Sequence, residues 1–406
     1  MPTKVTQSET QRIPKLRFPG FSGGWEEKKL ENISKINPST EDLPNEFIYI
    51  DLESVDAGTL KQENKIKKTE APSRAQRVLQ KNDILFQTVR PYQQNNLLFN
   101  FSGNYVASTG YAQIRAKDNP MFLYQYIHTP TFLNKVLVRC TGSNYPAINS
   151  SDVKKIKVSI PSLLEQQKIA SFLESTDELI NNLKEQKENL ESYKKGMMQK
   201  IFPSKGGQVS EIRFKPARNA SQSDAGGDEN GKEFPELEYK KLGQICNIKK
   251  GIQLNREGLS ENVGNPVING GVEPSGYTDI WNTKSNTITI SEGGNSCGFV
   301  NFIKKDFWCG GHCYSLLDLN KSINLVFLYQ YLKFLEKNIM RLRVGSGLPN
   351  IQKKDMEKLR LMIPLSLEQQ KIADFLGSID KLIESKQEQI TEAEQWKKGL
   401  MQGLFV

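Results

Sequence analysis

The sequence has few of the residues on which enzymes and secreted proteins most often depend. Only two of its 406 residues are histidine, and its five cysteines are an odd number that does not suggest a disulfide framework. No apolar run reaches the ~18–20 residues of a membrane span. The N-terminus lacks the apolar stretch of a secretory signal. These absences predict a cytoplasmic protein with reduced thiols.

Three short motifs resemble parts of active sites, and each lacks a necessary partner. Residues 226–232 fit G-x-x-x-x-G-K, but Glu233 replaces the Ser or Thr that would hold magnesium. The stretch Cys309–Cys313, with Cys297 upstream, resembles a zinc set, yet its adjacent His and Cys rarely face one metal. Glu238–Lys240 is an E-x-K without the Pro-Asp of nucleases, and no adenine methyltransferase motif is present. The sequence therefore predicts no catalytic residues and no metal site.

Length and charge are those of a protein with several domains and a modest excess of positive charge. A chain of 406 residues with 37% hydrophobic residues is long enough for two to three domains with their own cores. The formal net charge of +9 leans toward a polyanionic partner, although this alone decides little.

A repeated phrase divides the chain into two copies of one unit. Ile160–Leu173 reads IPSLLEQQKIASFL, and Ile363–Leu376 reads IPLSLEQQKIADFL, at an offset of 203 residues. The offset holds without a gap to KKGMMQKIF at Lys194–Phe202 and KKGLMQGLF at Lys397–Phe405. The lead-ins FPGFSGGWEEKKL and FPELEYKKL also match, whereas the middles of the two copies cannot be aligned. Such self-similarity indicates a duplicated supersecondary unit.

The middles have the pattern of mixed sheets and helices. Runs rich in β-branched and aromatic residues, separated by turn residues, predict strands at 46–52, 83–89, 96–101, 111–116, 154–161, 286–293, 296–303 and 358–364. Helical spacing predicts one helix at 121–137 and another at 327–340.

A long polar helix is predicted after each Ile-Pro strand end. Its apolar seam runs from Ile169 to Ile201 in the first copy and from Ile372 to Leu404 in the second, in alternating steps of three and four residues. This is the a/d pattern of a coiled coil, so we expect the two helices to pack on each other.

The predicted fold class is α+β, with two tandem pseudo-symmetric halves. Each half is a mixed α/β domain followed by a long helix, and the two helices pack on each other as a coiled coil. The expected boundaries are a first mixed domain at 14–160, a first long helix at 161–202, a partly disordered linker at 203–233, a second mixed domain at 234–363 and a second long helix at 364–406.

The two middles carry Arg, Lys, Asn and Gln beside aromatic residues in predicted loops. Arg can donate two hydrogen bonds to guanine, and Asn or Gln can form two hydrogen bonds with adenine. A Gly-Ser turn at Gly142–Pro146, matched at Gly345–Pro349, lies beside arginines and can offer backbone N–H groups to phosphate. The candidate DNA contacts are Arg74, Arg77, Arg90, Tyr92, Gln93, Gln94, Asn95, Arg139, Ser143 and Asn144 in the first copy, and Lys250, Asn255, Arg256, Asn269, Tyr277, Trp281, Asn282, Asn295, Arg341, Arg343 and Ser346 in the second.

The doubled frame resembles the specificity subunits of type I restriction–modification systems. The resemblance rests on the FPGF lead-in, on LEQQKIA-x-FL, on the long helix and on KKGLMQ-x-LF, and covers roughly residues 14–202 and 212–406. It implies a non-catalytic subunit in which the domains at 14–160 and 234–363 are target recognition domains that read a bipartite asymmetric DNA site. It implies also that the helices at 161–202 and 364–406 pack as an antiparallel coiled coil that acts as a spacer. It also implies partners: two modification subunits that use S-adenosylmethionine at adenine N6, and restriction subunits that use ATP and Mg. The stretch 216–232 between the halves departs from the family pattern.

The constant frames are the expected contact with two copies of one partner. The candidate partner-binding residues are Glu165, Gln166, Gln167, Lys168 and Phe172, and Glu368, Gln369, Gln370, Lys371 and Phe375. Two alternatives stay open: a repeat-built DNA-binding or scaffold protein with a different partner, and an enzyme that uses the 226–232 loop or the Cys/His cluster.

Overall fold

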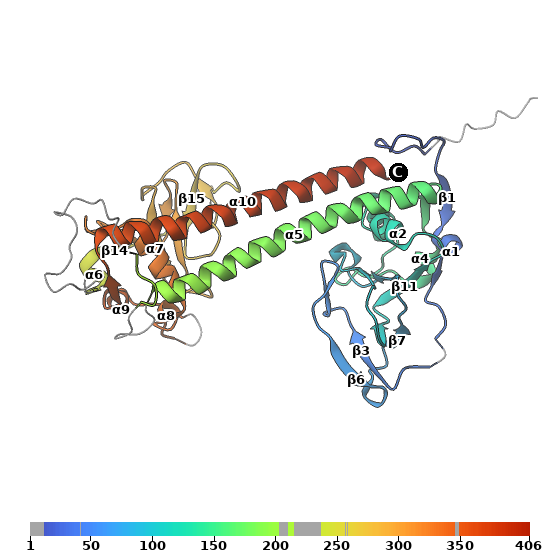
Figure 1. The fold of residues 1–406 in the computed structure, drawn as a ribbon, viewed down its shortest axis with the longest axis horizontal. Coiled ribbons are helices and arrows are strands. Elements are labelled where there is room, and N and C mark those ends of the chain that lie inside the picture. Colours follow the sequence, from blue (N-terminus) through green and yellow to red (C-terminus); the bar gives the residue numbers. More distant parts are fainter. Residues whose placement is uncertain are drawn as a thin grey trace, which may run out of the picture. The chain divides into compact units, whose positions relative to one another are not determined.

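The computed structural model describes residues 12–40, 42–202, 210–214, 237–255, 257, 259–345 and 349–406. The chain forms two compact units. Unit 1 comprises Met1–Lys184 and Glu388–Val406, and unit 2 comprises Glu185–Gln387. Each unit therefore contains a mixed sheet region, the beginning of one long helix and the end of the other (Figure 1). The predicted α+β class with two repeated halves is confirmed.

Each unit is built on the same four-stranded antiparallel sheet. In unit 1 the strand order is β2-β11-β8-β9, and in unit 2 it is β14-β20-β17-β18. The inner strands β8 and β17 are buried at every position, so both of their faces are covered. The strands are β2 Ser34–Ile36, β8 Asp83–Gln87, β9 Leu97–Leu98 and β11 Tyr111–Ala116, and β14 Asn247–Lys250, β17 Thr287–Ser291, β18 Val300–Ile303 and β20 Cys313–Leu317.

A second sheet in each unit contains one parallel pair. The orders are β6-β3-β10-β7 in unit 1 and β16-β15-β19 in unit 2, and β3 with β10 and β15 with β19 are parallel. The middles that could not be aligned by sequence thus share a topology. These strands are β3 Glu46–Ile50, β6 Asn64–Lys67, β7 Ala75–Val78 and β10 Tyr105–Ser108, and β15 Asn265–Ile268, β16 Tyr277–Thr278 and β19 Trp308–Cys309; β4 Val55–Asp56 and β5 Thr59–Leu60 form a separate hairpin.

The lead-in of each copy pairs with the strand that precedes its long helix. β1 (Glu26–Lys29) is antiparallel to β12 (Lys157–Ile160), and β13 (Glu238–Lys241) is antiparallel to β21 (Arg360–Ile363). The short helices that complete the units are α1 Leu30–Ile33, α4 Ser150–Lys155, α6 Leu242–Ile245 and α9 Lys353–Glu357, with 3-10 turns η1 at Lys68–Glu70 and η2 at Pro91–Gln93.

The single helices predicted at 121–137 and 327–340 are each two helices. In unit 1, α2 (Pro120–Ile127) ends before Thr129, whose hydroxyl caps α3 (Pro130–Leu137) by accepting from the Phe132 N–H. A proline at the first position of α3 suits a helix start and prevents continuation from α2. In unit 2 the same break separates α7 (Leu325–Phe334) from α8 (Glu336–Met340).

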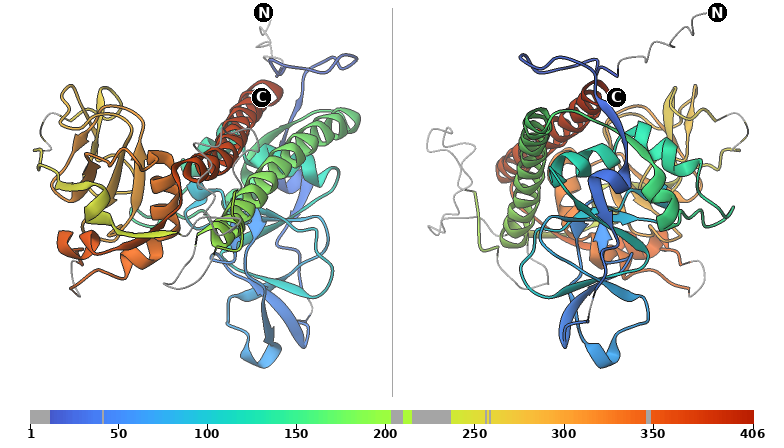
Figure 2. Two further views of the ribbon diagram at one scale, coloured as in Figure 1. Left: turned by 60° about the vertical axis from the view of Figure 1, so that its left-hand side comes forward. Right: turned by 90° about the vertical axis from the view of Figure 1, so that its right-hand side faces the viewer.

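The predicted coiled-coil seam is buried in both long helices. α5 spans Leu163–Ile201 and α10 spans Ser366–Leu404, and their seam positions are buried or half-buried while most residues between them are exposed. In unit 1 the partners are antiparallel, because Asp177 pairs with Lys397 and Lys184 pairs with Glu394. Figure 2 shows the two helices side by side in both of its views.

Each long helix ends inside the core of the unit built by the other copy. Phe405, at the end of α10, packs against Phe122 and Tyr126 of α2, with ring centroids 5.4 and 5.6 Å apart. Phe202, at the end of α5, stacks on Tyr331 of α7 at 4.5 Å. The repeated KKG-x-MQ-x-x-F sequence therefore completes the hydrophobic core of the unit whose sheets come from the other copy.

A matched polar triad joins the helix pair to the mixed sheet region in each unit. In unit 1 the Asp177 carboxylate accepts hydrogen bonds from Lys397 Nζ at 2.5 Å and Gln125 Nε2 at 2.8 Å. In unit 2 the Asp380 carboxylate accepts from Lys194 Nζ and Gln330 Nε2, both at 2.6 Å. Gln125 of α2 and Gln330 of α7 are 1% exposed, so the triads fix how α2 and α7 sit on the long helices.

Candidate nucleic-acid interface

In unit 1 two loops from distant parts of the chain meet at the end of β8. The residues after β8 lie beside the turn that contains Gly142, because Val89 bridges to Ala147 and the Arg90 N–H donates to the Pro146 carbonyl at 2.8 Å. The turn itself closes through Thr141 and Ala147. The structure thus brings together two groups of predicted DNA contacts, at 90–95 and at 143–144.

Arg90 is held in an unusual backbone conformation at this junction. Its φ of +52° and ψ of +54° lie in the left-handed region, which costs a non-glycine residue free energy. The guanidinium carbon lies 4.3 Å from the centroid of the Tyr145 ring. Backbone and side chain together therefore fix where this guanidinium lies.

A buried glutamine secures the loop that follows Arg90. The Gln87 side chain donates to Gln93 Oε1 at 2.9 Å and accepts from the Asn95 N–H at 3.0 Å. Gln94 is a second left-handed residue, and Asn95 Oδ1 accepts from the Ala57 N–H. Tyr92 stays 50% exposed, so the loop presents a ring to solvent from a rigid base.

The remaining candidates of unit 1 differ in exposure. Arg74 is exposed and precedes β7, whereas Arg77 lies within β7 and is half-buried. Burial lowers the pKa of Arg77, whose Nε has no hydrogen-bond partner in the structure. Ser143 and Asn144 are exposed, and Arg139 donates to the Lys135 carbonyl at 2.6 Å.

Unit 2 repeats the junction with different side chains. Gly293 bridges to Asn350, and the Gly294 N–H donates to the Pro349 carbonyl at 3.1 Å. Gly294, with φ +76°, takes the place that Arg90 has in unit 1. The backbone frame is therefore shared, while the side chain that it presents is not.

Several unit 2 candidates are engaged within the domain. Lys250 pairs with Glu292 at 2.5 Å, and Asn269 Oδ1 accepts from the His312 N–H. Asn282 donates to the Cys309 carbonyl and accepts from the Cys309 N–H at 2.7 Å. These contacts give Asn282 a structural role in holding β19.

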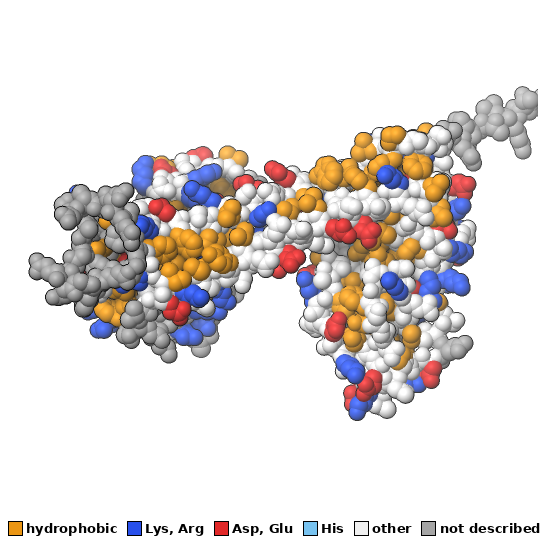
Figure 3. All heavy atoms as spheres, viewed as in Figure 1, with side chains coloured by type: hydrophobic (Ala, Val, Ile, Leu, Met, Phe, Trp, Pro, Cys, Tyr) orange, Lys and Arg blue, Asp and Glu red, His pale blue; other side chains and the backbone are white. Residues whose placement is uncertain are grey.

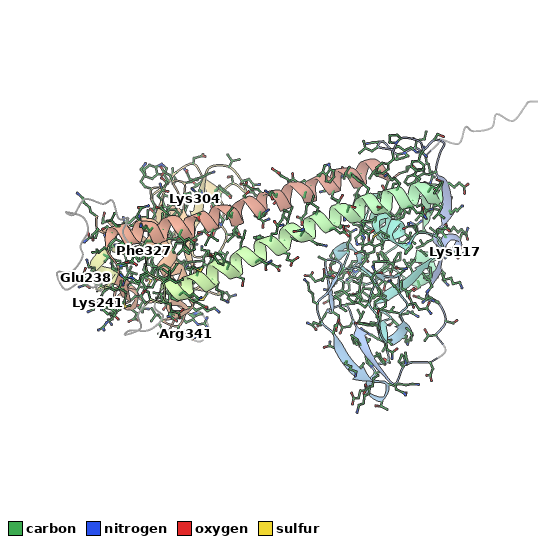
Figure 4. All side chains as sticks on the ribbon, in the orientation of Figure 1. Lys117, Glu238, Lys241, Lys304, Phe327 and Arg341 are labelled. Carbon is green, nitrogen blue, oxygen red and sulfur yellow. The ribbon has the colours of Figure 1, made fainter. Side chains whose placement is uncertain are left out.

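Other unit 2 candidates face solvent. Trp281 is 45% exposed, and Lys284 Nζ lies 3.8 Å from the centroid of its ring. Asn255, Asn295, Arg341 and Arg343 are exposed, and Tyr277 is half-buried in β16. Arg341 follows α8 directly (Figure 4). Arg256 and Ser346 lie outside the described residues.

The repeated Leu-Glu-Gln-Gln-Lys residues divide into buried anchors and exposed positions. Glu165 is 2% exposed by side chain and forms an ion pair with Arg17 at 2.8 Å. Glu368 pairs in the same way with Arg213 at 2.7 Å. Arg17 lies in the segment Leu16-Arg17-Phe18 and Arg213 in the similar segment Ile212-Arg213-Phe214, so one ion-pair clasp is repeated at the start of each long helix.

The other candidates of this set follow the same division. Gln166 and Gln369 are buried, and each donates to the carbonyl of the proline before its helix. Phe172 and Phe375 are half-buried and pack on Phe18 and Phe214. The exposed or partly exposed members are Gln167, Lys168, Gln370 and Lys371.

The cysteine cluster of unit 2 is packed as part of the core. The Cys309 and Cys313 thiols are buried and donate to backbone carbonyls, whereas the His312 side chain is 66% exposed. The hydrogen bond to Cys309 and burial raise the pKa of Cys313. Across the described ranges, no three His, Cys, Asp or Glu side chains are grouped as metal ligands. The 226–232 loop lies outside the described residues.

No helix within the described part of the chain has the length and apolarity to cross a membrane.

The family model of the type I restriction modification DNA specificity domain matches residues 22–192 and again 235–395. The chain belongs to this family. It carries the domain twice, and specificity subunits of this family are the non-catalytic, DNA-recognising part of a type I complex.

Relatives of known class agree with the family assignment. The chain is 37% identical over 153 residues to the putative type I specificity subunit S.MpnORF638P of Mycoplasma pneumoniae, covering 37% of this chain and 40% of that one. It is 25% identical to the type I restriction enzyme MjaIX specificity subunit of Methanocaldococcus jannaschii, covering 98% and 95%. The S subunit crystal structure from M. genitalium superposes with a TM-score of 0.63 at 18% identity, over 97% of this chain and 99% of that one, and so shares the fold.

Sequence reasoning did not include Tyr145 or Gln87 among the site residues. Tyr145 supports Arg90 by stacking, and an aromatic residue within the repeated Gly-Ser turn was a usable signal. Gln87 lies in a strand that is buried at every position, and nothing in its sequence context marks it as the support of a loop.

Proposed function

We propose that this chain reads a bipartite asymmetric DNA site, with one recognition domain for each half of the site. On that DNA it positions two adenine-N6 methyltransferase subunits, and restriction subunits join the same complex. S-adenosylmethionine, ATP and Mg belong to those partner subunits. The recognition domains correspond to residues 14–160 and 234–363, and the helices at 161–202 and 364–406 act as the spacer.

One observation carries this proposal: two equivalent backbone junctions present different side chains. A protein that reads two unlike half-sites needs the same framework twice with different base-reading loops. Arg90 and Gly294 stand at equivalent positions with matching backbone hydrogen bonds. The exposed Arg, Asn and aromatic side chains around these junctions suit base edges and phosphates.

The direct test is to map methylated adenines. The chain is co-expressed with its modification subunit in a host without other adenine methylation, and N6-methyladenine is sequenced across the genome. The expected motif has two specific parts separated by unspecified bases. A matched experiment replaces residues 34–153 with the middle of a relative, and only one half of the motif should then change. A single continuous motif, or no methylation with an active modification subunit, would refute the proposal.

The spacer role has its own test. Deleting one heptad from α5 between Lys184 and Glu191 removes about two turns of one helix. The unspecified gap should change, or binding should be lost. Methylation of the original motif at the original gap would contradict this role.

The partner surface lies on the paired helices. Exposed apolar side chains recur there at the 203-residue offset: Leu164 and Leu367, Leu179 and Leu382, and Tyr193 and Trp396, each 46–71% exposed. Figure 3 shows hydrophobic side chains at the surface along these helices. Because the set is duplicated, it suits two copies of one partner.

Leu179→Lys and Leu382→Lys test this surface. Each single variant should retain one modification subunit and the double variant none, as measured by the mass of the purified complex. Glu188→Lys, at an exposed position of α5, is the matched control. If a different protein co-purified with the chain and no methyltransferase did, the alternative scaffold function would be favoured.

A further inference from the structure

Arg90 combines a stacked side chain with the lack of a carboxylate partner. Arg12, Arg17 and Arg115 of unit 1 each pair with an acidic residue, whereas among the described residues no acidic side chain forms an ion pair with Arg90. Its guanidinium carbon lies 4.3 Å from the centroid of the Tyr145 ring. A guanidinium stacked in this way keeps its N–H groups available for another ligand.

The backbone at Arg90 has a conformation that is unfavourable for an arginine. A left-handed conformation is unfavourable for arginine and is further restricted before a proline, here Pro91. Unit 2 builds the same junction with Gly294, for which this conformation has no steric cost. The framework therefore accepts glycine, and a functional reason must account for the arginine.

We propose that Arg90, stacked on Tyr145, reads a guanine in the half-site of unit 1. This inference rests on the proposed DNA-recognition function and names the base that one side chain recognises. The guanidinium donates two parallel hydrogen bonds to O6 and N7 of guanine in the major groove. Tyr145 holds its orientation, and Gln87 fixes the loop that follows.

A phosphate contact is the competing role for Arg90. A phosphate needs positive charge from any long flexible side chain, and it does not require a strained backbone or a stacked ring. The left-handed backbone and the stacked ring both fix the orientation of the guanidinium. A fixed orientation favours a planar ligand, and the edge of a base is planar.

The experiment uses the assembled methyltransferase complex with Arg90→Gly. Genome-wide mapping of methylated adenines should show one G·C position of the unit 1 half-site becoming degenerate, with the other half unchanged. Discrimination at that position should fall by about 10- to 100-fold in competition between matched and substituted DNA duplexes. The thermal midpoint of the variant should equal or exceed that of the wild type, because the strain is relieved.

Three further variants separate the roles. Tyr145→Phe keeps the ring and should keep the motif, whereas Tyr145→Ala should relax the same G·C position in part. Asn82→Gly, at another left-handed residue of unit 1, is the control for backbone relief and should leave the motif unchanged.

Two outcomes would overturn the inference. An unchanged motif in Arg90→Gly would mean that Arg90 reads no base. Uniformly weaker binding to all sequences, with a shallower salt dependence, would assign Arg90 to a phosphate. Both outcomes leave the proposed function intact, whereas a wild-type complex without a bipartite motif would refute that function itself.

Discussion

The two units use one backbone plan for different surfaces. Their four-stranded sheets have corresponding orders, their second sheets each contain a parallel pair, and their junctions close through equivalent bridges. The side chains at matched positions nevertheless differ: Arg90 corresponds to Gly294, and the half-buried His128 corresponds in sequence to Lys333. Identity is retained where both units must pack the same long helices, and is lost where each must present its own loops.

The hollows beside the matched triads illustrate the same division. In unit 1 the charged residues that line the hollow between α2 and the long helices are Glu174, Asp177, Glu178 and Lys397, so acidic groups predominate. In unit 2 the charged residues of the corresponding hollow are Lys194, Lys195, Lys333, Lys337, Arg341, Glu191, Glu336 and Asp380, so basic groups predominate. Shared architecture therefore does not imply shared charge, and each domain can be adjusted without disturbing the helix pair.

Removing the aromatic plugs should produce the largest effects and should separate the units. Phe405→Ala should destabilise unit 1, and Phe202→Ala unit 2, each by about 3–5 kcal/mol, because a buried ring is replaced by a cavity. Limited proteolysis with mass spectrometry would identify which unit opens. If both units opened to the same extent in either variant, they would not be separate folding units.

Breaking the lead-in clasps should come next in size. Arg17→Ala leaves Glu165 buried without its ion pair, and Arg213→Ala does the same to Glu368, at a cost of about 3 kcal/mol each. Denaturant unfolding measures the change. Arg17→Ala combined with Glu165→Gln should recover part of the loss, and failure to recover it would show that the clasp acts through packing alone.

The polar triads should contribute less than the clasps. Asp177→Asn or Asp380→Asn weakens hydrogen bonds from a lysine and a glutamine and should cost about 1.5 kcal/mol. Glu384→Gln is the control in α10, because its pair with Lys304 is exposed and should change stability by less than about 0.5 kcal/mol. Equal effects of Asp380→Asn and Glu384→Gln would contradict the role of the triad.

The smallest expected effect is a pH dependence confined to unit 1. Burial lowers the pKa of His128 below its ordinary value of 6.5, and neutral His128 accepts from Asn96 and donates to the Tyr124 carbonyl. The unfolded chain binds the proton more tightly, so unit 1 should lose stability as the pH falls below about 6.5. His128→Gln should reduce this loss between pH 7.5 and 5.5 in thermal unfolding, and an unchanged dependence would locate it elsewhere.

Much of the fold followed from periodicity and repetition. The strand at 111–116 was predicted with its observed bounds, and both coiled-coil seams are buried as expected. The helix at 121–137 was wrong as a single element, because its apolar spacing continues across Thr129 while the Pro130 ring ends the hydrogen-bond ladder. The common topology of the middles was not visible, since buried strand positions accept many apolar residues and leave no identity to align.

The candidate site was less predictable than the fold. Residue type identified exposed groups such as Tyr92 and Trp281, but could not distinguish them from Asn282, whose partner Cys309 lies 27 residues away. Glu165 likewise meets Arg17 across 148 residues. Hydrogen-bond partners at such separations are set by the tertiary fold, and side-chain chemistry alone does not reveal them.

The order in which the two units can finish folding follows from the places where the long helices end. Phe405 and its neighbours in 388–406 complete the core of unit 1, although the whole of unit 2 is encoded between them and Lys184. On the ribosome, unit 2 can close as soon as α10 has begun to form, while the earlier unit waits with an open core. The part of the protein made first is therefore the part that finishes folding last.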